Sequence, residues 1–252
     1  IDGLLEVLCE KGEFACKPCN GALAAGFHML AYKDGGYLID GRPSDAEGVR
    51  AFVEGHPNYI FTEFIRPSAQ MAAIDPLIHT LRLVMTNTTG TNPTMISSYL
   101  RFGMGSDKSG ATANYAPPTA GDIGAYNVRF DINTGEFGDG VIVYANRNVP
   151  SPRHPDSGVL AEGMVEDWPQ IEERLKQLAL RLVPLSYLGF DLGLTDKGPK
   201  LMEINSHPGI EYVQLHKPLM ADPVAGAYYR ECIAKVDALT PEQKRARNGI
   251  AH

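Results

Sequence analysis

The chain has 252 residues, 44% hydrophobic side chains and a formal net charge of -7. This length supports one large domain or two small ones with a buried core. The mildly acidic charge, without a basic stripe, argues against a nucleic-acid partner. No apolar run is long enough to cross a membrane and no signal peptide opens the sequence, so we expect a cytoplasmic protein. Because the first residue is Ile1 and not Met, we expect processing or a longer parent chain.

Four cysteines occur, and two of them, Cys16 and Cys19, form a C-x-x-C motif. Such a motif is either a redox pair or half of a zinc site. Zinc needs a second pair, which Cys9 and Cys232 do not form. A redox pair should open a helix, whereas Phe14–Pro18 has the pattern of a strand that runs into a glycine-bearing turn. We therefore predict reduced thiols, as in other cytosolic proteins.

The first half of the chain carries signals for one helix and three strands. Ser44-Asp-Ala-Glu47 has the pattern of a capping box and predicts a helix that runs through Val53. Residues 87–125 are rich in Gly, Thr, Asn and Pro and predict a long polar loop, which is usually functional or mobile. Runs rich in β-branched and aromatic residues predict strands at Tyr59–Ile65, Thr80–Thr86 and Tyr99–Phe102. The last of these strands lies inside the polar loop.

The second half carries signals for two hairpins and two helices. Prolines suited to a first helical turn predict helices that start at Asp167-Trp168-Pro169 and at Asp222-Pro223. Residues from Thr240 onward are polar and predict a frayed tail. Alternating runs around short turns predict hairpins with strands at 127–132 and 141–144, and at Tyr187–Leu194 and Lys200–Asn205. This mixed order of strands and helices indicates the α+β class, not a doubly wound sheet.

Oxygen donors gather on the last predicted hairpin. Glu203 and Asn205 are two residues apart on the returning strand, so their side chains share a face. Asp191 lies on the outgoing strand, and the short turn brings the three side chains near one another. Carboxylate and amide oxygens are ligands that Mg²⁺ prefers. We predict that Asp191, Glu203 and Asn205 hold Mg²⁺; the alternative is a polar cap at a strand end.

A lysine near the amino terminus is a candidate phosphate ligand. Lys17 leaves the predicted strand and is followed by a loop that contains Gly21 and Gly26. A lysine in this position can reach phosphate oxygens, while the N–H groups of the loop surround them. The loop matches neither of the common phosphate-binding glycine motifs. The alternative is a solvated lysine beside a turn.

Motifs along the chain resemble the ATP-grasp superfamily, and most closely its sugar-transfer-associated group. The likeness covers nearly all of residues 14–216, and the triplet of Asp191, Glu203 and Asn205 is its most specific part. The motifs are, in order, FACKPCNGALAAGFHML, YIFTEFI, HTLRLVM, Arg101-Phe-Gly103, His154-Pro-Asp-Ser-Gly158, Trp168 and GFDLGLTDKGPKLMEIN.

The resemblance implies roles for matching residues. Lys17 would contact the α- and β-phosphates of ATP, and Arg82 would neutralise the transferring phosphate or a bound carboxylate. The linker of Glu63, Phe64 and Ile65 would hold adenine through its backbone. The triplet would ligate Mg²⁺. Further candidates near the same site are Arg101 and Arg129 for catalysis and Asn114 for cofactor binding; for each arginine the alternative is a surface ion pair of little energetic value.

Arg82 lies in the middle of a predicted strand, between Leu81 and Leu83. A charged group inside such a strand must be paired or face a wet cleft. The resemblance places this face of the strand toward the γ-phosphate. The alternative is a buried ion pair with an acid such as Asp75 or Asp131.

The resemblance also implies the domain arrangement. Residues 1–62 would form part of a small α+β lobe, 63–239 a second lobe with the metal hairpin, and 240–252 a polar tail. ATP would lie between the lobes. The family's N-terminal substructure and its first nucleotide-binding lysine are expected to precede residue 1.

The implied reaction is ATP- and Mg²⁺-dependent ligation of a small-molecule carboxylate to an amine through an acylphosphate. A kinase of the same fold, which passes phosphate to a hydroxyl group, uses the same metal triplet and stays open. A non-catalytic nucleotide-binding module also stays open, because the N-terminal substructure is missing from this sequence and its glycine loop is rich in alanine.

Overall fold

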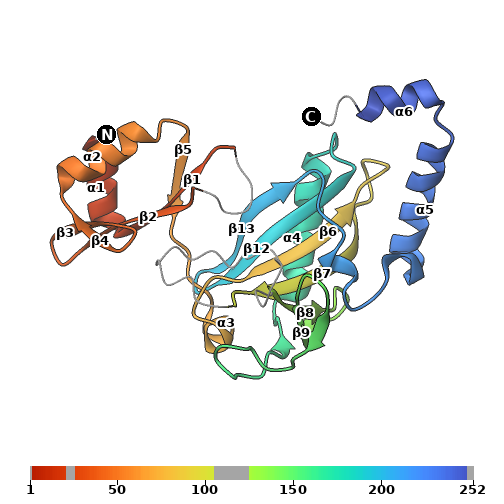
Figure 1. Ribbon diagram of the computed structural model, residues 1–252, viewed down its shortest axis with the longest axis horizontal. Helices are drawn as coiled ribbons and strands as arrows, with labels where there is room; N and C mark the ends of the chain where they lie inside the picture. Colours follow the sequence, from red (N-terminus) through yellow and green to blue (C-terminus); the bar gives the residue numbers. More distant parts are fainter. Residues whose placement is uncertain (1, 21–25, 105–124, 249–252) are drawn as a thin grey trace.

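The chain folds into two lobes that lie side by side, each built on its own antiparallel sheet (Figure 1). The computed structural model describes residues 2–20, 26–104 and 125–248. Within these ranges the first lobe has a five-stranded sheet in the order β4-β3-β2-β1-β5. Its elements are α1 (Asp2–Lys11), β1 (Glu13–Pro18), β2 (His28–Lys33), β3 (Gly36–Ile39), β4 (Arg42–Ser44), α2 (Ala46–Gly55) and β5 (Tyr59–Glu63).

The first lobe has a small hydrophobic core between its sheet and its two helices. Leu8 of α1, Leu30 of β2 and Val49 of α2 are fully buried there. Alternation along β1 buries Phe14 and Cys16 in the same core. The residue that follows them, Lys17, remains partly exposed.

Two predicted boundaries in this lobe need correction. The helix α2 begins one residue later than predicted, because Asp45 is the N-cap residue and its side chain accepts a hydrogen bond from the Gly48 backbone at 2.8 Å. Ser44 instead ends β4. The strand predicted to reach Ile65 ends at Glu63, and the chain continues as an irregular linker to the second lobe.

The second lobe has an eight-stranded antiparallel sheet in the described residues. The strand order is β10-β9-β8-β7-β6-β12-β13, and β11 pairs with β9. Its strands are β6 (Thr80–Thr86), β7 (Thr94–Phe102), β8 (Ala125–Phe130), β9 (Glu136–Val143), β10 (Asn148–Pro150), β11 (Gly163–Met164), β12 (Tyr187–Thr195) and β13 (Gly198–Asn205). Its helices are α3 (Ala69–Ile74), α4 (Trp168–Arg181), α5 (Pro223–Asp237) and α6 (Pro241–Asn248), with 3-10 turns η1 (Tyr212–Gln214) and η2 (Leu219–Ala221).

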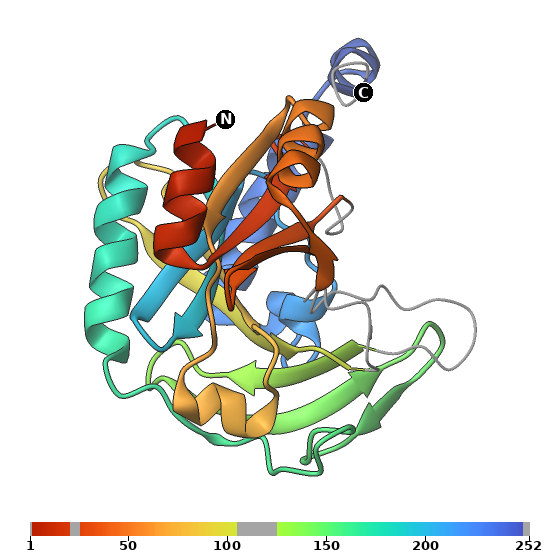
Figure 2. The ribbon, with the colours of Figure 1, turned by 90° about the vertical axis from the view of Figure 1, so that its left-hand side faces the viewer.

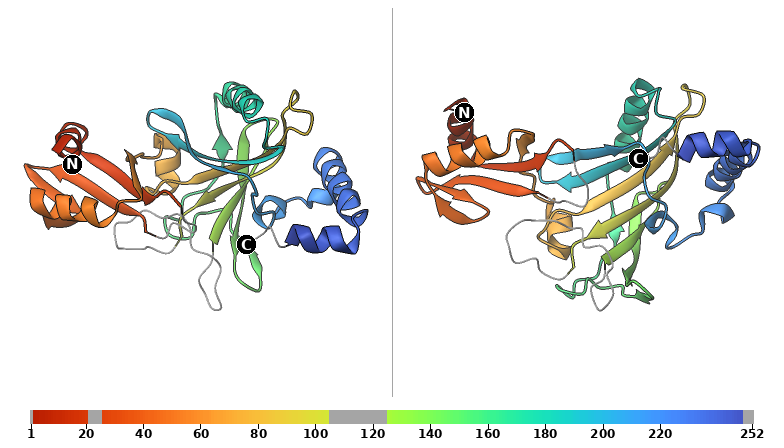
Figure 3. Two further views of the ribbon diagram at one scale, coloured as in Figure 1. Left: turned by 90° about the horizontal axis from the view of Figure 1, so that it is seen from above. Right: turned by 45° about the horizontal axis from the view of Figure 1, so that its top comes forward.

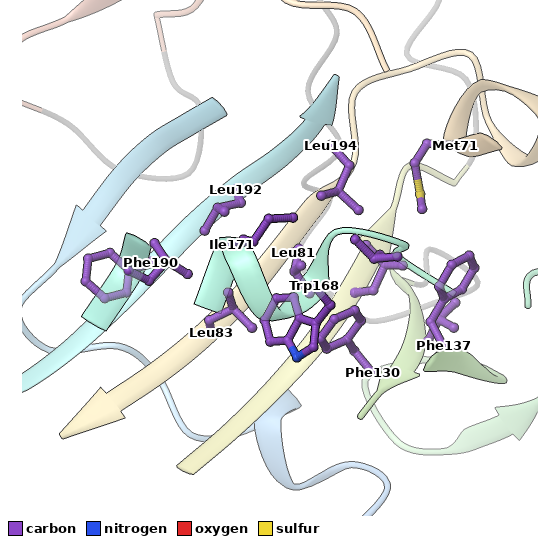
Figure 4. Close-up of a cluster of buried hydrophobic side chains, with 14 of the residues drawn as sticks. Met71, Leu81, Leu83, Phe130, Phe137, Trp168, Ile171, Phe190, Leu192 and Leu194 are labelled. Carbon is purple, nitrogen blue, oxygen red and sulfur yellow. The ribbon is translucent and has the colours of Figure 1, made fainter. Parts of the chain in front are cut away.

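Alternation along these strands gives the large sheet two different faces. One face carries Leu81 and Leu83 of β6 and packs under α3 and α4 to form the main core, which also holds Phe190 and Trp168 (Figure 4). The other face carries the alternate residues of each strand, such as Arg82 between Leu81 and Leu83, and is covered in part by η1, η2 and α5. Figure 3 shows α4 on one side of the sheet and the C-terminal helices on the other. Charged side chains on the strands therefore collect on the second face, which we call the polar face.

Trp168 fixes the start of α4 against the core. Its side chain is 1% exposed, its Nε1–H donates to the Ile132 carbonyl at 2.8 Å, and its ring meets Phe130 edge to face. We expect Trp168→Ala to lower the free energy of unfolding by about 3–5 kcal/mol, because it leaves a large cavity. Trp168→Phe should cost less, about 1–2 kcal/mol, mainly through the lost hydrogen bond.

Urea unfolding followed by far-UV circular dichroism measures both variants, since Trp168 is the chain's single tryptophan and its fluorescence disappears with it. A loss below about 1 kcal/mol in Trp168→Ala would contradict the placement of this side chain in the main core.

The carboxyl-terminal part contains one helix more than the sequence predicts. Helix α5 begins as predicted, with Asp222 as N-cap, and is followed by α6 in the region predicted to be a frayed tail. The strand predicted at Tyr99–Phe102 is longer and begins at Thr94. No helix in the described ranges is both long and apolar enough to cross a membrane.

No disulfide joins the four cysteines, all of which lie in the described residues. Cys9 and Cys19 are exposed, whereas Cys16 is fully buried and burial raises the pKa of its thiol to about 12. We expect a thiol reagent at pH 8 to modify Cys9 and Cys19 quickly and Cys16 only after denaturation, because the thiolate is the reactive form. Protein purified without reductant should give four thiols in denaturant. Two fewer thiols, or one zinc per chain by elemental analysis, would reverse this prediction.

Candidate functional site

A row of polar side chains crosses the polar face of the large sheet. Tyr99 of β7 is the cross-strand partner of Arg82 on β6, Arg82 is the partner of Asp191 on β12, and Asp191 is the partner of Glu203 on β13. Partners directly opposite each other in antiparallel strands point to the same face. Asn205, two residues beyond Glu203, shares that face too. Four neighbouring strands therefore place these five residues on one surface.

Arg82 and Asp191 form a forked ion pair in this row. The Nη2 group of Arg82 donates to Asp191 Oδ2 at 2.7 Å, and Nε donates to Oδ1. Both side chains are mostly buried, 16% and 9% exposed. Burial disfavours the charged form of Arg82, but the hydrogen bonds that Arg82 donates to Asp191 outweigh the effect of burial. The pKa of Arg82 is therefore raised above its usual range.

The ion-pair partners suggested by the sequence, Asp75 and Asp131, are wrong. Asp75 accepts from the Leu77 backbone and lies 3.9 Å from His154, and burial raises its pKa. Asp131 caps the turn before β9 by accepting from Asn133. The sequence could not choose among acids, because β6 and β12 are neighbours in the sheet but about a hundred residues apart in the chain.

The donor chemistry of Asp191, Glu203 and Asn205 fits a hard cation. Two carboxylates and one amide lie on adjacent strands of one face, and Glu203 is exposed without an ion pair to any described residue. The Nδ2 atom of Asn205 is buried and has no hydrogen-bond partner. No cluster of three or more His, Cys, Asp or Glu residues suited to a metal ion occurs in the described part of the chain. A cation here would therefore need the side-chain oxygen of Asn205 as a third ligand. Asp191 would bind the cation either while it keeps its ion pair with Arg82 or after that ion pair has opened.

A pocket of about 290 Å³ opens where the two lobes meet. Its walls come from β1, the loop before β2, the end of β5 with the linker, and β13. The residues that line it are Ala15, Lys17, Phe27, Thr62, Glu63, Phe64, Ile65, Ile78, Lys200, Leu201 and Met202. Figure 2 shows how the first lobe stands over this side of the large sheet. Most of the lining side chains are apolar, and two lysines, Lys17 and Lys200, are among the others.

Lys17 reaches from the first lobe to the second across this pocket. Its Nζ donates to the Met202 carbonyl at 3.2 Å, although 185 positions separate the two residues. Met202 is the extra residue of a β-bulge, because Asp191 pairs with Glu203 whereas Leu192 pairs with Leu201. A bulged residue is unpaired with the neighbouring strand. Lys17 is thus held at the pocket wall beside Glu203, not solvated at a turn.

The linker predicted to hold adenine lines the same pocket. Glu63 forms ion pairs with Lys197 at 2.6 Å and Lys200 at 3.1 Å, and these bonds lower the pKa of its carboxyl. Beyond it, the Ser68 backbone donates to the Leu194 carbonyl at 2.8 Å. Both ends of the linker are therefore attached to the β12–β13 hairpin, with Phe64 and Ile65 between them at the pocket wall.

The remaining predicted residues are spread more widely. Arg101 is 3% exposed on β7, two residues from Tyr99, and its guanidinium lies over the Tyr212 ring. Arg129 on β8 donates from Nε to Asp139 at 2.7 Å and lines a different cavity. Gly26 has a φ of +76°, a backbone conformation that favours glycine, and a Cβ there would lie 2.6 Å from the Tyr59 hydroxyl. Gly21 and Asn114 lie outside the described residues.

Comparison with known proteins assigns the family. The profile of the sugar-transfer associated ATP-grasp family matches residues 7–222, which is most of the chain. The chain belongs to this family. No curated protein has a matching sequence.

Among the solved structures similar to this chain, three have 12–13% sequence identity to it. The ATP-grasp ligase PsnB, complexed with minimal precursor, is 12% identical with a TM-score of 0.44, over 92% of this chain and 52% of that chain. D-alanyl-alanine synthetase A from Vibrio cholerae is 13% identical with a TM-score of 0.45, over 85% and 48%. D-alanine–D-alanine ligase from Bacillus anthracis is 13% identical with a TM-score of 0.39, over 92% and 53%. This ATP-grasp chain thus spans about half the length of each.

Several residues of the candidate site carry no signal that the sequence analysis used. Tyr99 could have been found, because it is two residues from Arg101 on a predicted strand and so shares its face. Phe27, Ile78 and Met202 line the pocket between the lobes, and no local pattern marks them. They reach it only through the long-range arrangement of the two sheets.

Proposed function

We propose that the protein is an ATP- and Mg²⁺-dependent ligase that joins a small-molecule carboxylate to an amine. The adenine ring would occupy the pocket between the lobes, beside the backbone of Glu63, Phe64 and Ile65. Lys17 would donate to phosphate oxygens in place of the Met202 carbonyl. Arg82 would face the group that is transferred.

The observation that carries this proposal is the meeting of the pocket and the polar face at β13. Met202 lines the pocket, and the next residue, Glu203, belongs to the row with Asp191 and Arg82. A nucleotide in the pocket would therefore have its phosphates beside two carboxylates, an arginine and a lysine. Phosphoryl transfer depends on such positioning and charge neutralisation.

The proposed reaction has two steps. A carboxylate oxygen of the acid attacks the γ-phosphorus of ATP, and ADP leaves, which gives an acylphosphate. The amine nitrogen then displaces phosphate and loses a proton, which leaves an amide. Mg²⁺, held by Asp191, Glu203 and Asn205, would neutralise phosphate charge. The guanidinium of Arg82 would donate to the oxygens that gain charge in either step.

ADP release tests this proposal. The protein is incubated with ATP and Mg²⁺, with pools of carboxylic acids, of amines and of hydroxyl compounds added separately, and with the acids and amines added together. A ligase needs both pools for full release and forms amide and phosphate. Release that depends on hydroxyl compounds alone, with phosphorylated product, would identify a kinase instead. ATP binding without release under any condition would identify a nucleotide-binding module.

A pair of lysine variants controls the test. Lys17→Met should lower ATP affinity by about tenfold or more, because a charge-assisted bond to phosphate is lost. Lys33→Met, at an exposed end of β2, removes the same charge away from the pocket and should leave ATP binding unchanged. Equal ATP affinity in the two variants would exclude Lys17 as a phosphate ligand.

A further inference from the structure

A second cavity lies on the polar face of the large sheet. It has a volume of about 200 Å³ and lies between β7, β8 and the segment that carries η1 and η2. It shares no lining residue with the pocket between the lobes. Its walls combine apolar and polar side chains, among them Ile96, Val213 and Leu219, and Ser97, Arg129 and His216.

Two buried polar atoms in this wall have no partner. Ser97 is 9% exposed, and its Oγ atom is buried without a hydrogen bond; the Nε2 atom of His216 is in the same state. An unsatisfied buried group costs about 1–3 kcal/mol. The neighbouring Ser98 also lines the cavity, yet its Oγ donates to the Phe130 carbonyl at 2.7 Å. The cavity is far larger than the roughly 10–15 Å³ that one water needs, so there is room for a larger guest.

The third polar group is the guanidinium of Arg129. Its Nε donates to Asp139 Oδ2 at 2.7 Å, and within the described residues its two Nη groups have no hydrogen-bond acceptor. An arginine oriented through Nε by one carboxylate keeps its Nη donors for a second acceptor. Burial lowers the pKa of His216, so its imidazole is neutral at pH 7 and has one N–H to donate.

The charges around the cavity favour a guest with a single negative charge. Two cations, Arg129 and Lys217, are balanced by two anions, Asp131 and Asp222, in the lining. Lys217 is already paired with Asp222 at 2.7 Å. Arg129 is in turn paired with Asp139, so a doubly charged phosphate would meet the carboxylate of Asp131 without an unpaired cation in the lining, whereas a singly charged carboxylate meets less repulsion and can still accept from the Nη groups of Arg129.

We propose that this cavity binds the carboxylate of a small molecule. Ser97 Oγ, His216 Nε2 and the Arg129 Nη groups donate to its oxygens, and the apolar side of the cavity contacts its hydrocarbon part. The oxygens of the guest then satisfy three donors of the cavity wall. The site is separate from the nucleotide pocket, and its occupation does not depend on the ligase proposal.

Butyrate is a suitable probe, because it has one carboxylate and a short apolar chain. It is titrated without nucleotide into the full chain carrying isotope-labelled histidine, and the imidazole signals are followed by NMR. The His216 signal is assigned with His216→Gln. We expect a saturable shift of this signal with a Kd of about 1–10 mM, as suits a ligand of this size. Butyramide and inorganic phosphate should bind at least about tenfold more weakly, because one lacks the charge and the other carries too much.

Matched serine variants make the test specific. Ser97→Ala should weaken butyrate binding about tenfold, since a hydrogen bond to a charged group is lost, and Arg129→Met should weaken it at least as much. Ser98→Ala removes the bonded neighbour and should bind butyrate within twofold of wild type. Lack of saturation at about 100 mM butyrate, equal or tighter binding of butyramide or phosphate, or unchanged affinity in Ser97→Ala would each overturn the proposal.

Discussion

Glu203→Ala should abolish Mg²⁺-dependent turnover of ATP, a loss of at least about a hundredfold, in a preparation that turns over ATP. Even a residue that only orients a metal ligand changes affinity or activity by about 10–100-fold, so loss of a ligand should exceed this. The fold should survive, because Glu203 is exposed and has no ion pair in the described structure. Surface changes of this kind alter stability by about 0.5 kcal/mol or less.

Two measurements separate a metal role from a structural one. The Mg²⁺ concentration needed for half-maximal turnover should rise steeply in Glu203→Gln, which keeps the shape but removes the charge. Glu136→Gln, on an exposed end of β9, serves as the matched control and should behave as wild type. Wild-type Mg²⁺ dependence in Glu203→Gln would remove Glu203 from the metal site.

Arg82→Met should lower turnover by about a hundredfold or more, about 3 kcal/mol, as expected for loss of a donor that stabilises developing charge. It should also destabilise the fold by about 3–5 kcal/mol, because Asp191 would remain as a buried carboxylate without its partner. Arg82→Lys should rescue activity poorly, since an ammonium group cannot form the forked pair.

A double variant distinguishes the two effects of Arg82. In Arg82→Met with Asp191→Asn the uncompensated charge is gone, so most of the stability should return while turnover stays low. Thermal unfolding and kcat, both measured per folded molecule, check this. If Arg82→Met alone has the kcat of wild type once corrected for the unfolded fraction, Arg82 serves stability only.

Mg²⁺ offers an independent check on the same pair. Without Arg82, Asp191 and Glu203 would be two neighbouring carboxylates, and a cation should relieve their repulsion. We therefore expect Mg²⁺ to raise the melting temperature of Arg82→Met more than that of wild type. Equal shifts in both proteins would argue against a cation site at these residues.

Local signals predicted much of the second lobe. Alternation placed Arg82, Asp191, Glu203 and Asn205 on the polar face of their strands, because a period of two fixes the direction of each side chain without knowledge of the fold. The Asp-Trp-Pro sequence predicted the start of α4 for a similarly local reason. What alternation could not supply was the order of strands, and hence the pairing of Arg82 with Asp191 across β6 and β12.

The first lobe was predicted less well, although its hairpins carry a usable signal. The turns β2–β3 and β3–β4 contain Asp34-Gly35 and Asp40-Gly41, and all four residues have positive φ. Asp-Gly pairs of this kind favour the two-residue turns of tight hairpins. The strands themselves are short and carry few β-branched residues, so composition alone did not reveal them. The contact of Lys17 with Met202 depends on both lobes and has no local signal.

The bulge in the β12–β13 hairpin makes the chain one residue longer there than regular pairing needs. Asp191 opposite Glu203 and Leu192 opposite Leu201 would be consecutive pairs if Met202 were absent. A deletion of this single residue should therefore keep the strand register and the acidic pair intact, yet remove the carbonyl that Lys17 contacts. Substitution at position 202 cannot do the same, because any amino acid supplies a carbonyl. On the β13 side, this attachment is thus insensitive to substitution at position 202 and sensitive to chain length, and we expect natural variation at this position to appear as gained or lost residues.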